Sequence, residues 1–375
     1  MDERHEDGVD MVRALTRWQR LGLATLFVVG VFVVGAAVFV WTGYYNISAK
    51  SKHWDFVTAI LETVRDQSIR TRASGIAVPD LDDPAMIALG REHFRGGCTS
   101  CHGLPDQERN PIAIAMLPDP PDLLYAHGHY DARALFWLID NGIKYTGMPA
   151  WPADDRQDEV WPMVAYLVDL HERRETRTPI PDSSPDGVAV DDFGFHTLPE
   201  CSRCHGDADI PPISTLVPEL AGQPVEYLAR ALREYRAGTR PSGYMVPAAY
   251  SLTDAEISEL AAYYAQLAPR AAEIEGDAAR IARGAEIVLR GVPSRDVPAC
   301  TGCHGNGNPQ FPNLAGQSER YLAGQLDLWQ RGGRDLTGHG EIMSVIAERL
   351  TPGQIRDVSA YFASRPPPGT GESRP

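Results

Sequence analysis

The sequence predicts an all-α protein in which one membrane-spanning helix precedes three small helical domains. Three observations predict this. Residues 21–41 form an apolar run without a charge, a Cys-x-x-Cys-His motif occurs three times, and no segment sustains the two-residue alternation of a β-strand. The length of 375 residues agrees, because one domain per about 100–200 residues gives two to four domains.

The charge balance excludes nucleic acid as a partner. The chain has 35 Lys and Arg against 50 Asp and Glu, a net charge of −15, whereas nucleic-acid binding needs a basic surface. An acidic surface suits a partner protein with a basic docking patch, although the same charge could serve solubility alone.

Residues 21–41 are predicted to span a membrane as an uncleaved anchor. About 20 apolar residues are needed to cross the hydrocarbon core, whereas the core of a signal peptide has about 7–15 and ends at an Ala-x-Ala-like site. No such site is obvious, so a cleaved signal is the weaker alternative. Four arginines precede the run: Arg4, Arg13, Arg17 and Arg20. The positive-inside rule then places residues 1–20 in the cytoplasm and residues 42–375 on the periplasmic side of a bacterial inner membrane.

Residues 42–80 are predicted to form a juxtamembrane helix and a linker. Trp54, Val57, Leu61 and Val64 recur at three- and four-residue steps, which gives one apolar stripe. The stripe could pack on a following domain, on lipid or on a partner subunit.

The first domain is expected over residues 81–175. Helices are predicted at 83–97, 131–142 and 158–174, and the Pro-rich stretch 111–124 is predicted to be a loop. Residues 176–187 have the composition of a linker.

Residues 188–270 and 275–366 are expected to be a second and a third domain, because they repeat each other. Both contain Cys-x-x-Cys-His-Gly, then Leu-Ala-Gly-Gln at 220–223 and 314–317, and then a methionine seven residues before Leu-Thr. Residues 367–375 are expected to be a disordered tail.

The Cys-x-x-Cys-His motifs predict three covalently attached c-type haems. Two thiols three residues apart on one turn can form thioethers with the two vinyl groups, and the next imidazole can then bind the iron. The thiols are Cys98, Cys101, Cys201, Cys204, Cys300 and Cys303, and the imidazoles belong to His102, His205 and His304.

Thioredoxin-like redox pairs, zinc sites and disulfides are the alternatives. A redox pair does not require the histidine that follows all three pairs, and zinc would combine two pairs and leave one over.

Methionines are predicted as the sixth ligands, which would close the iron to substrates. In the second and third domains Met245 and Met343 are the only candidates of this type, and His339 is a rival to Met343. In the first domain Met148 is favoured over Met116 and Met163.

Other charged residues have two possible roles. Arg236, Arg331 and Arg334 precede the ligand methionines, and could pair with haem propionates or be ordinary exposed arginines. His93 is predicted at the surface, and the loop residues His127 and His129 could face solvent or a propionate.

Through these motifs, residues 190–366 resemble the dihaem cytochromes of the cytochrome c-four type, and residues 81–175 resemble a monohaem class I cytochrome c. The strongest segments are CTGCHG with NLAGQSERYLAGQL in the third domain and GMPAW in the first. The resemblance implies three tandem class I cytochrome domains and the His and Met ligands named above. The second domain departs from the pattern, since no amphipathic helix precedes its motif.

The expected function is therefore one-electron transfer without catalysis. The expected partners are a terminal oxidase, a quinol-oxidising complex or a dehydrogenase, and a respiratory chain that ends in an oxidase is favoured. The alternatives are a cytochrome subunit of a periplasmic dehydrogenase or larger membrane complex and, less favoured, a haem peroxidase.

Overall fold

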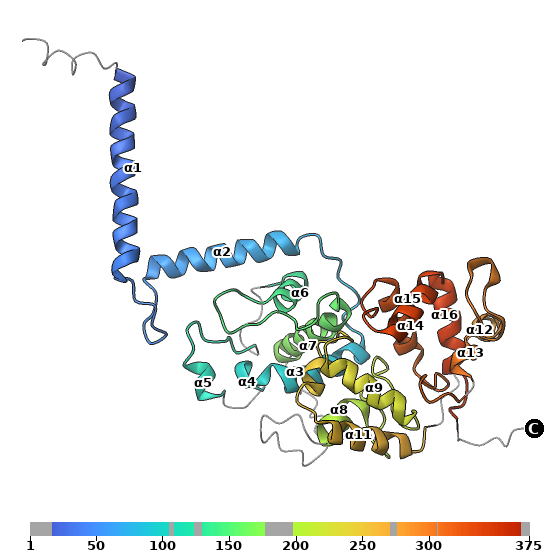
Figure 1. Cartoon of the computed structure of the whole chain (residues 1–375). Helices are drawn as coiled ribbons and strands as arrows, with labels where there is room; N and C mark the ends of the chain where they lie inside the picture. Colours follow the sequence, from blue (N-terminus) through green and yellow to red (C-terminus); the bar gives the residue numbers. More distant parts are fainter. Residues whose placement is uncertain are drawn as a thin grey trace, which may run out of the picture. The chain divides into compact units, whose positions relative to one another are not determined.

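The computed structural model describes residues 17–104, 109–123, 130–176, 198–270, 276–305 and 307–368 (Figure 1). Within these ranges the chain is helical, and the only β pairing described is an isolated bridge between Val292 and Val297. The all-α prediction is therefore confirmed. The chain divides into two compact units, residues 1–60 and 61–375.

The first unit contains α1 (Arg17–Thr42), which includes the whole predicted span 21–41. None of its residues is buried, and it is long and apolar enough to cross a membrane by length and composition. Aromatic side chains gather at its end, where the ring of Phe39 lies 6.2 Å from Tyr44, 6.3 Å from Tyr45 and 6.3 Å from Trp54. The predicted juxtamembrane helix follows as α2 (Asp55–Ala73).

In the second unit the first motif lies among five helices: α3 (Pro84–Gly97), α4 (Thr99–His102), α5 (Pro111–Ile114), α6 (Ala132–Asn141) and α7 (Gln157–Thr176). The α3 helix begins because the Asp83 carboxylate caps the amide of Ala85 and Pro84 fits the first turn.

The prediction that residues 111–124 form a loop is wrong in one detail. Asn110 caps Ile112 and Pro111 again suits a first turn, so one helical turn forms there.

The second motif lies in α8 (Leu198–His205), followed by α9 (Val225–Arg236), α10 (Met245–Ala249) and α11 (Asp254–Gln266). The predicted linker 176–187 and the start of the second domain fall almost entirely outside the described residues.

The third motif lies among α12 (Ala278–Arg290), the 3₁₀ turn η2 (Pro293–Arg295), α13 (Thr301–His304), α14 (Glu319–Gln330), α15 (Gly338–Glu348) and α16 (Pro352–Ala363).

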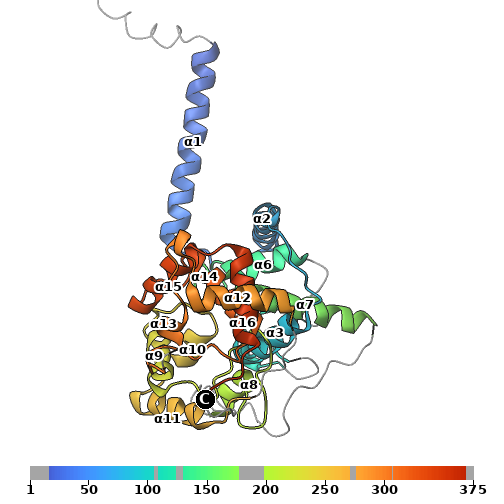
Figure 2. The same cartoon turned by 90° about the vertical axis from the view of Figure 1, so that its right-hand side faces the viewer.

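Two helix crossings require glycine. A Cβ at Gly284 of α12 would lie 2.0 Å from the carbonyl oxygen of Asp357 on α16, and a Cβ at Gly90 of α3 would lie 1.9 Å from that of Pro162 on α7. Both views show α12 and α16 side by side (Figures 1 and 2). Helix α3 thus crosses α7, and α12 crosses α16, with their backbones in direct contact.

The repeated Leu-Ala-Gly-Gln segments meet each other in space. The Gln223 amide donates to the carbonyl of Asn313 at 2.8 Å and accepts from its N–H at 3.0 Å. The Gln317 amide makes the same pair of bonds with Glu219, at 2.6 Å and 3.1 Å. Asn313 stands four residues before Gln317, and Glu219 stands four residues before Gln223. Each repeat therefore binds the other through equivalent positions, which gives the contact a local pseudo-two-fold symmetry.

Three hydrophobic clusters form around the three motifs. Cys98 packs on the cluster of α3, α6 and α7, Cys201 on that of α9 and α11, and Cys300 on that of α12, α14 and α16. The division into three domains stays a prediction, and these clusters are consistent with it.

Candidate functional site

Each Cys-x-x-Cys-His motif occupies one helical turn. The His102 amide donates to the Cys98 carbonyl at 2.9 Å, and the His304 amide donates to the Cys300 carbonyl at 2.9 Å. The second motif lies wholly within α8. One turn of helix brings the two thiols of a pair to the same side, which is the geometry that attachment to the edge of a flat macrocycle requires.

All twelve predicted haem residues line one cavity of ≈ 1350 Å³. The six cysteines are free thiols in the structure, which gives no support to the disulfide alternative. Burial raises the pKa of Cys98 to about 12 and those of Cys201, Cys204 and Cys300 to about 11, so these thiols are neutral. Among the described residues no three His, Cys, Asp or Glu side chains lie together as they would around a metal ion.

The three motif histidines make the same hydrogen bond. In each the ring Nδ1 contacts a proline carbonyl oxygen, at 2.8 Å between His102 and Pro121, 3.2 Å between His205 and Pro218, and 3.1 Å between His304 and Pro312. A carbonyl only accepts, so Nδ1 carries the proton and the Nε2 lone pair is left for a metal. Burial lowers the pKa of all three imidazoles, which favours the neutral ligand form.

The predicted methionine ligands Met148, Met245 and Met343 lie in the cavity wall. Of the rivals, Met116 does not line the cavity, whereas Met163 lines it from the buried face of α7 and His339 lines it beside Met343. Met148 is fixed by its neighbours, since its amide donates to the Thr146 hydroxyl at 3.1 Å. The assignment of the methionines as ligands stays a prediction.

Two arginines that line the cavity lie near each other, Arg240 and Arg334. Arg240 is 5% exposed and its guanidinium lies 4.5 Å from the ring of Tyr235, while that of Arg334 lies 4.2 Å from the ring of Trp329. Neither forms an ion pair with a carboxylate among the described residues, and Arg240 Nε is buried without a hydrogen-bond acceptor. Burial and the nearby Arg240 lower the pKa of Arg334.

One buried and one half-buried guanidinium without a carboxylate partner among the described residues fit a ligand that carries carboxylates, such as haem with its propionates. The apolar cavity, the neutral thiols and the Nε2 lone pairs fit the rest of that group.

The three arginines named from the sequence lie in different environments. Arg334 lines the cavity, and Arg331 is exposed at its rim, 3.9 Å from an oxygen of Asp158. Arg236 does not line it, because Asp254 holds its guanidinium at 2.7 Å. Sequence reasoning missed Arg240, whose position five residues before Met245 is the signal that could have identified it.

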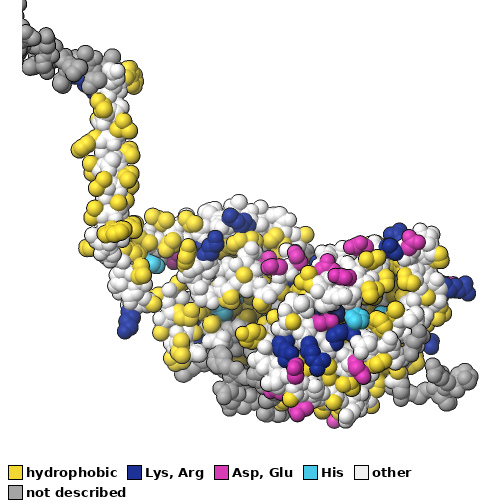
Figure 3. All heavy atoms as spheres, in the orientation of Figure 1, with side chains coloured by type: hydrophobic (Ala, Val, Ile, Leu, Met, Phe, Trp, Pro, Cys, Tyr) yellow, Lys and Arg dark blue, Asp and Glu magenta, His cyan; other side chains and the backbone are white. Residues whose placement is uncertain are grey.

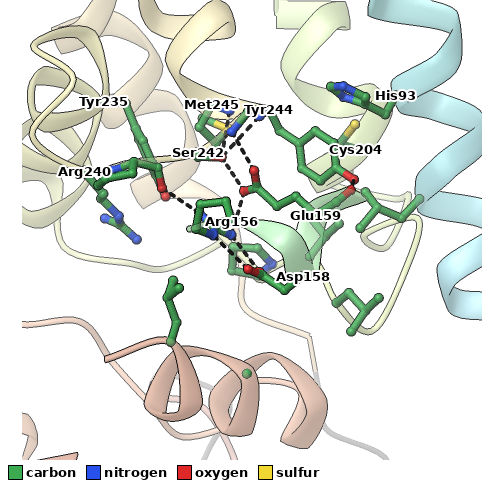
Figure 4. A pocket seen from close by; sticks show the side chains of 18 of the residues that line it. His93, Arg156, Asp158, Glu159, Cys204, Tyr235, Arg240, Ser242, Tyr244 and Met245 are labelled. Carbon is green, nitrogen blue, oxygen red and sulfur yellow. Dashed lines mark hydrogen bonds and ion pairs between the residues drawn. The ribbon is translucent and has the colours of Figure 1, made fainter. Parts of the chain in front are cut away.

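A buried carboxylate links the first motif's helices to the loop before Met245 (Figure 4). Glu159 accepts from the Ser242 hydroxyl at 2.6 Å and the Gly243 amide at 2.5 Å, and it pairs with Arg156 at 2.6 Å. Ser242 Oγ in turn accepts from the amide of Met245 at 3.0 Å. Burial raises the pKa of Glu159 to about 7. No local sequence signal predicts this contact, which joins residues more than 80 positions apart.

The prediction of a surface position for His93 is wrong. Its ring packs 4.9 Å from Trp151 and 4.0 Å from Tyr244, the residues beside the Met148 and Met245 loops. Burial, with Arg203 nearby, lowers the pKa of His93 to about 3. The helix that carries it packs on a later part of the chain, which its local sequence could not indicate. His127 and His129 lie outside the described residues.

Comparison with known proteins points to one group. Residues 85–167 match the profile of the family described as cytochrome C oxidase, cbb3-type, subunit III. A thiosulfate dehydrogenase electron acceptor of Stutzerimonas stutzeri is 35% identical over 182 residues, which cover 46% of this chain and 82% of that protein. Cytochrome c4 of Azotobacter vinelandii is 31% identical over 177 residues, 43% of this chain and 82% of that protein. A cytochrome c4 structure from Acidithiobacillus ferrooxidans is 34% identical and covers 44% of this chain and 97% of that one, with a TM-score of 0.41.

Proposed function

Because this chain belongs to the family of c-type cytochrome electron carriers that includes cytochrome c4, we propose that it is a membrane-anchored trihaem cytochrome that passes single electrons between respiratory components. Three haem groups, one at each motif, would supply the one-electron chemistry of iron.

The chain's own residues would attach, orient and insulate these groups. The paired thiols would hold each macrocycle, the imidazole and a methionine sulfur would bind its iron, and Arg240 with Arg334 would neutralise carboxylates on the second and third groups. An iron bound by both ligands would have no open position for substrate, so this arrangement favours a carrier over a peroxidase.

The repeated histidine geometry carries the proposal. Three imidazoles from separate parts of the chain each direct Nδ1 to a proline carbonyl and lie on one cavity with a methionine. A thioredoxin-like pair would have no use for this hydrogen bond.

Mass spectrometry of the purified protein tests the haem count. Three haem masses covalently added to the polypeptide are expected, and fewer than three would refute the trihaem assignment. Met148→Ala, Met245→Ala and Met343→Ala should each remove one methionine-type charge-transfer absorption and lower one potential, because a thioether ligand raises the potential. Met116→Ala, which alters a methionine outside the cavity, is the matched control.

For the partner we favour a terminal oxidase, with the cytochrome at the periplasmic face of the inner membrane and α1 as its uncleaved anchor. The match of residues 85–167 to an oxidase subunit family supports this. A dehydrogenase is the second candidate, since two relatives are named electron acceptors of thiosulfate dehydrogenase.

Purification in mild detergent separates the two candidates. Co-elution with oxidase subunits and oxygen-dependent reoxidation are expected. Co-elution with a dehydrogenase, and reduction by its substrate, would favour the second. A high-spin ferric signal with peroxide turnover would contradict both.

A further inference from the structure

We propose that α2 is an interfacial helix whose exposed apolar face binds the surface of an anionic lipid bilayer. This face, called here the α2 apolar face, consists of Phe56, Ile60, Leu61 and Val64. The inference rests on the membrane anchoring proposed above and adds a second, independent contact with the lipid.

None of the described residues covers the apolar face. Its four side chains are between 50% and 61% exposed, although they recur at three- and four-residue steps as in a helix that buries one side. An apolar stripe of this kind on a helix is unusual for a surface in water and is typical of a contact surface.

The opposite side of α2 is already occupied. Ile69 and Ala73 are buried against Ala134 of α6, and Asp66 accepts a hydrogen bond of 2.6 Å from the hydroxyl of Tyr130. The sequence left open whether α2 packs on a following domain, on lipid or on a partner subunit, and the two sides of the helix differ in this respect. The C-terminal half packs on the first motif's helices, and the N-terminal apolar face is free for another surface.

The position of α2 along the chain selects lipid as that surface. Only residues 43–54 separate α2 from the end of α1, and Trp54, the residue before α2, packs against Phe39 in the last turns of α1. Tyr45 and Phe56 complete this aromatic group, with ring centroids 5.1 Å and 5.7 Å from Trp54. Aromatic side chains concentrate at the headgroup level of a bilayer, so the first turn of α2 begins there.

Charge supports an anionic lipid in particular. Residues 50–73 contain five basic and three acidic residues in a chain with a net charge of −15. Figure 3 shows hydrophobic side chains over the first turns of α2 and Lys and Arg side chains further along it. Arg70 and Arg72 are exposed in the last turn, where their positive charge favours an anionic surface.

Thiol accessibility tests the inference in the full-length holoprotein. All six native cysteines lie in the motifs, so an added cysteine is the one free thiol once haem is attached. Ile60→Cys and Val64→Cys are compared with Glu62→Cys, an exposed position off the apolar face. Each is reconstituted in vesicles of phosphatidylcholine and phosphatidylglycerol and treated with a charged maleimide. The first two should react about tenfold or more slowly than the third, because the interface buries an apolar face in the acyl boundary.

Equal rates at the three positions would overturn the proposal. Protection that grows with the protein-to-lipid ratio would instead indicate a second copy as the cover, and would also overturn it. In a further variant, Leu61→Glu should restore the reactivity of Val64→Cys. Extraction with alkaline carbonate tests the anchor separately, since release of the protein would refute the transmembrane assignment of α1 whatever the thiols of α2 report.

Discussion

Replacing Gln317 by alanine should loosen the contact between the two Leu-Ala-Gly-Gln repeats. Its amide is 5% exposed and makes two hydrogen bonds with the backbone of Glu219, and alanine leaves both backbone groups without a partner. A buried backbone group left without its partner costs about 1–3 kcal/mol. For two such groups we expect a loss of about 2–6 kcal/mol in the free energy of unfolding, the lower value applying if water replaces the amide.

The symmetry of the contact supplies an internal check. Gln223→Ala removes the equivalent two bonds with Asn313 and should cost a similar amount. Gln266→Ala, which truncates an exposed glutamine at the end of α11, should change the free energy by less than about 0.5 kcal/mol. If both variants remove the same cooperative contact, the loss in the double variant will be smaller than the sum of the single losses.

Calorimetry and denaturant titration of the holoprotein measure these changes. The haem absorption bands should stay unchanged in both single variants, since neither amide belongs to the predicted axial ligands. A midpoint of unfolding that shifts no more in Gln317→Ala than in Gln266→Ala would refute the reasoning.

Three further predictions concern the buried groups. Burial raises the pKa of Glu159 in the folded protein to about 7, above its ordinary value of 4.5. Its protonation therefore contributes stability below pH 4.5 that is lost as the pH rises to 7. In Glu159→Gln, urea titrations should show a free energy of unfolding that depends less on pH over this range, and an unchanged dependence would contradict the assignment. Arg240→Met should lower the midpoint potential of the nearest haem in a redox titration, because a nearby cation favours the ferrous form, whereas Arg236→Met, outside the cavity, should not. Gly284→Leu should abolish the crossing of α12 on α16 and cost about 3 kcal/mol or more in thermal unfolding. Gly75→Ala, with no atom within 4 Å of the added Cβ, should have little effect.

The local parts of the site could be predicted from the sequence because their chemistry is local. Two cysteines and a histidine within five residues form one helical turn wherever that turn is placed, so the residue types alone predict haem attachment. The helices of the first domain follow from apolar spacing and from caps such as Asp83, which are also short-range signals. Relatives of the cytochrome c4 type agree with this prediction.

The long-range parts could not be predicted in this way. The surface prediction for His93 failed because its burial depends on Trp151 and Tyr244, which are far from it in the chain. The repeat of Leu-Ala-Gly-Gln was visible, but only the structure shows that each glutamine recognises the other repeat.

The sequence by itself determined the motif chemistry, the helical class and the apolar span, because each depends on residue types within a few turns of one another. Only the tertiary structure decided which buried charges meet. Arg240 lies near Arg334 without a carboxylate partner among the residues that the structure describes. Glu159 binds the loop before Met245, and the two segments share no sequence signal. Burial removes these charged groups from water and thereby shifts their pKa values, and which groups are buried depends on how the whole chain packs.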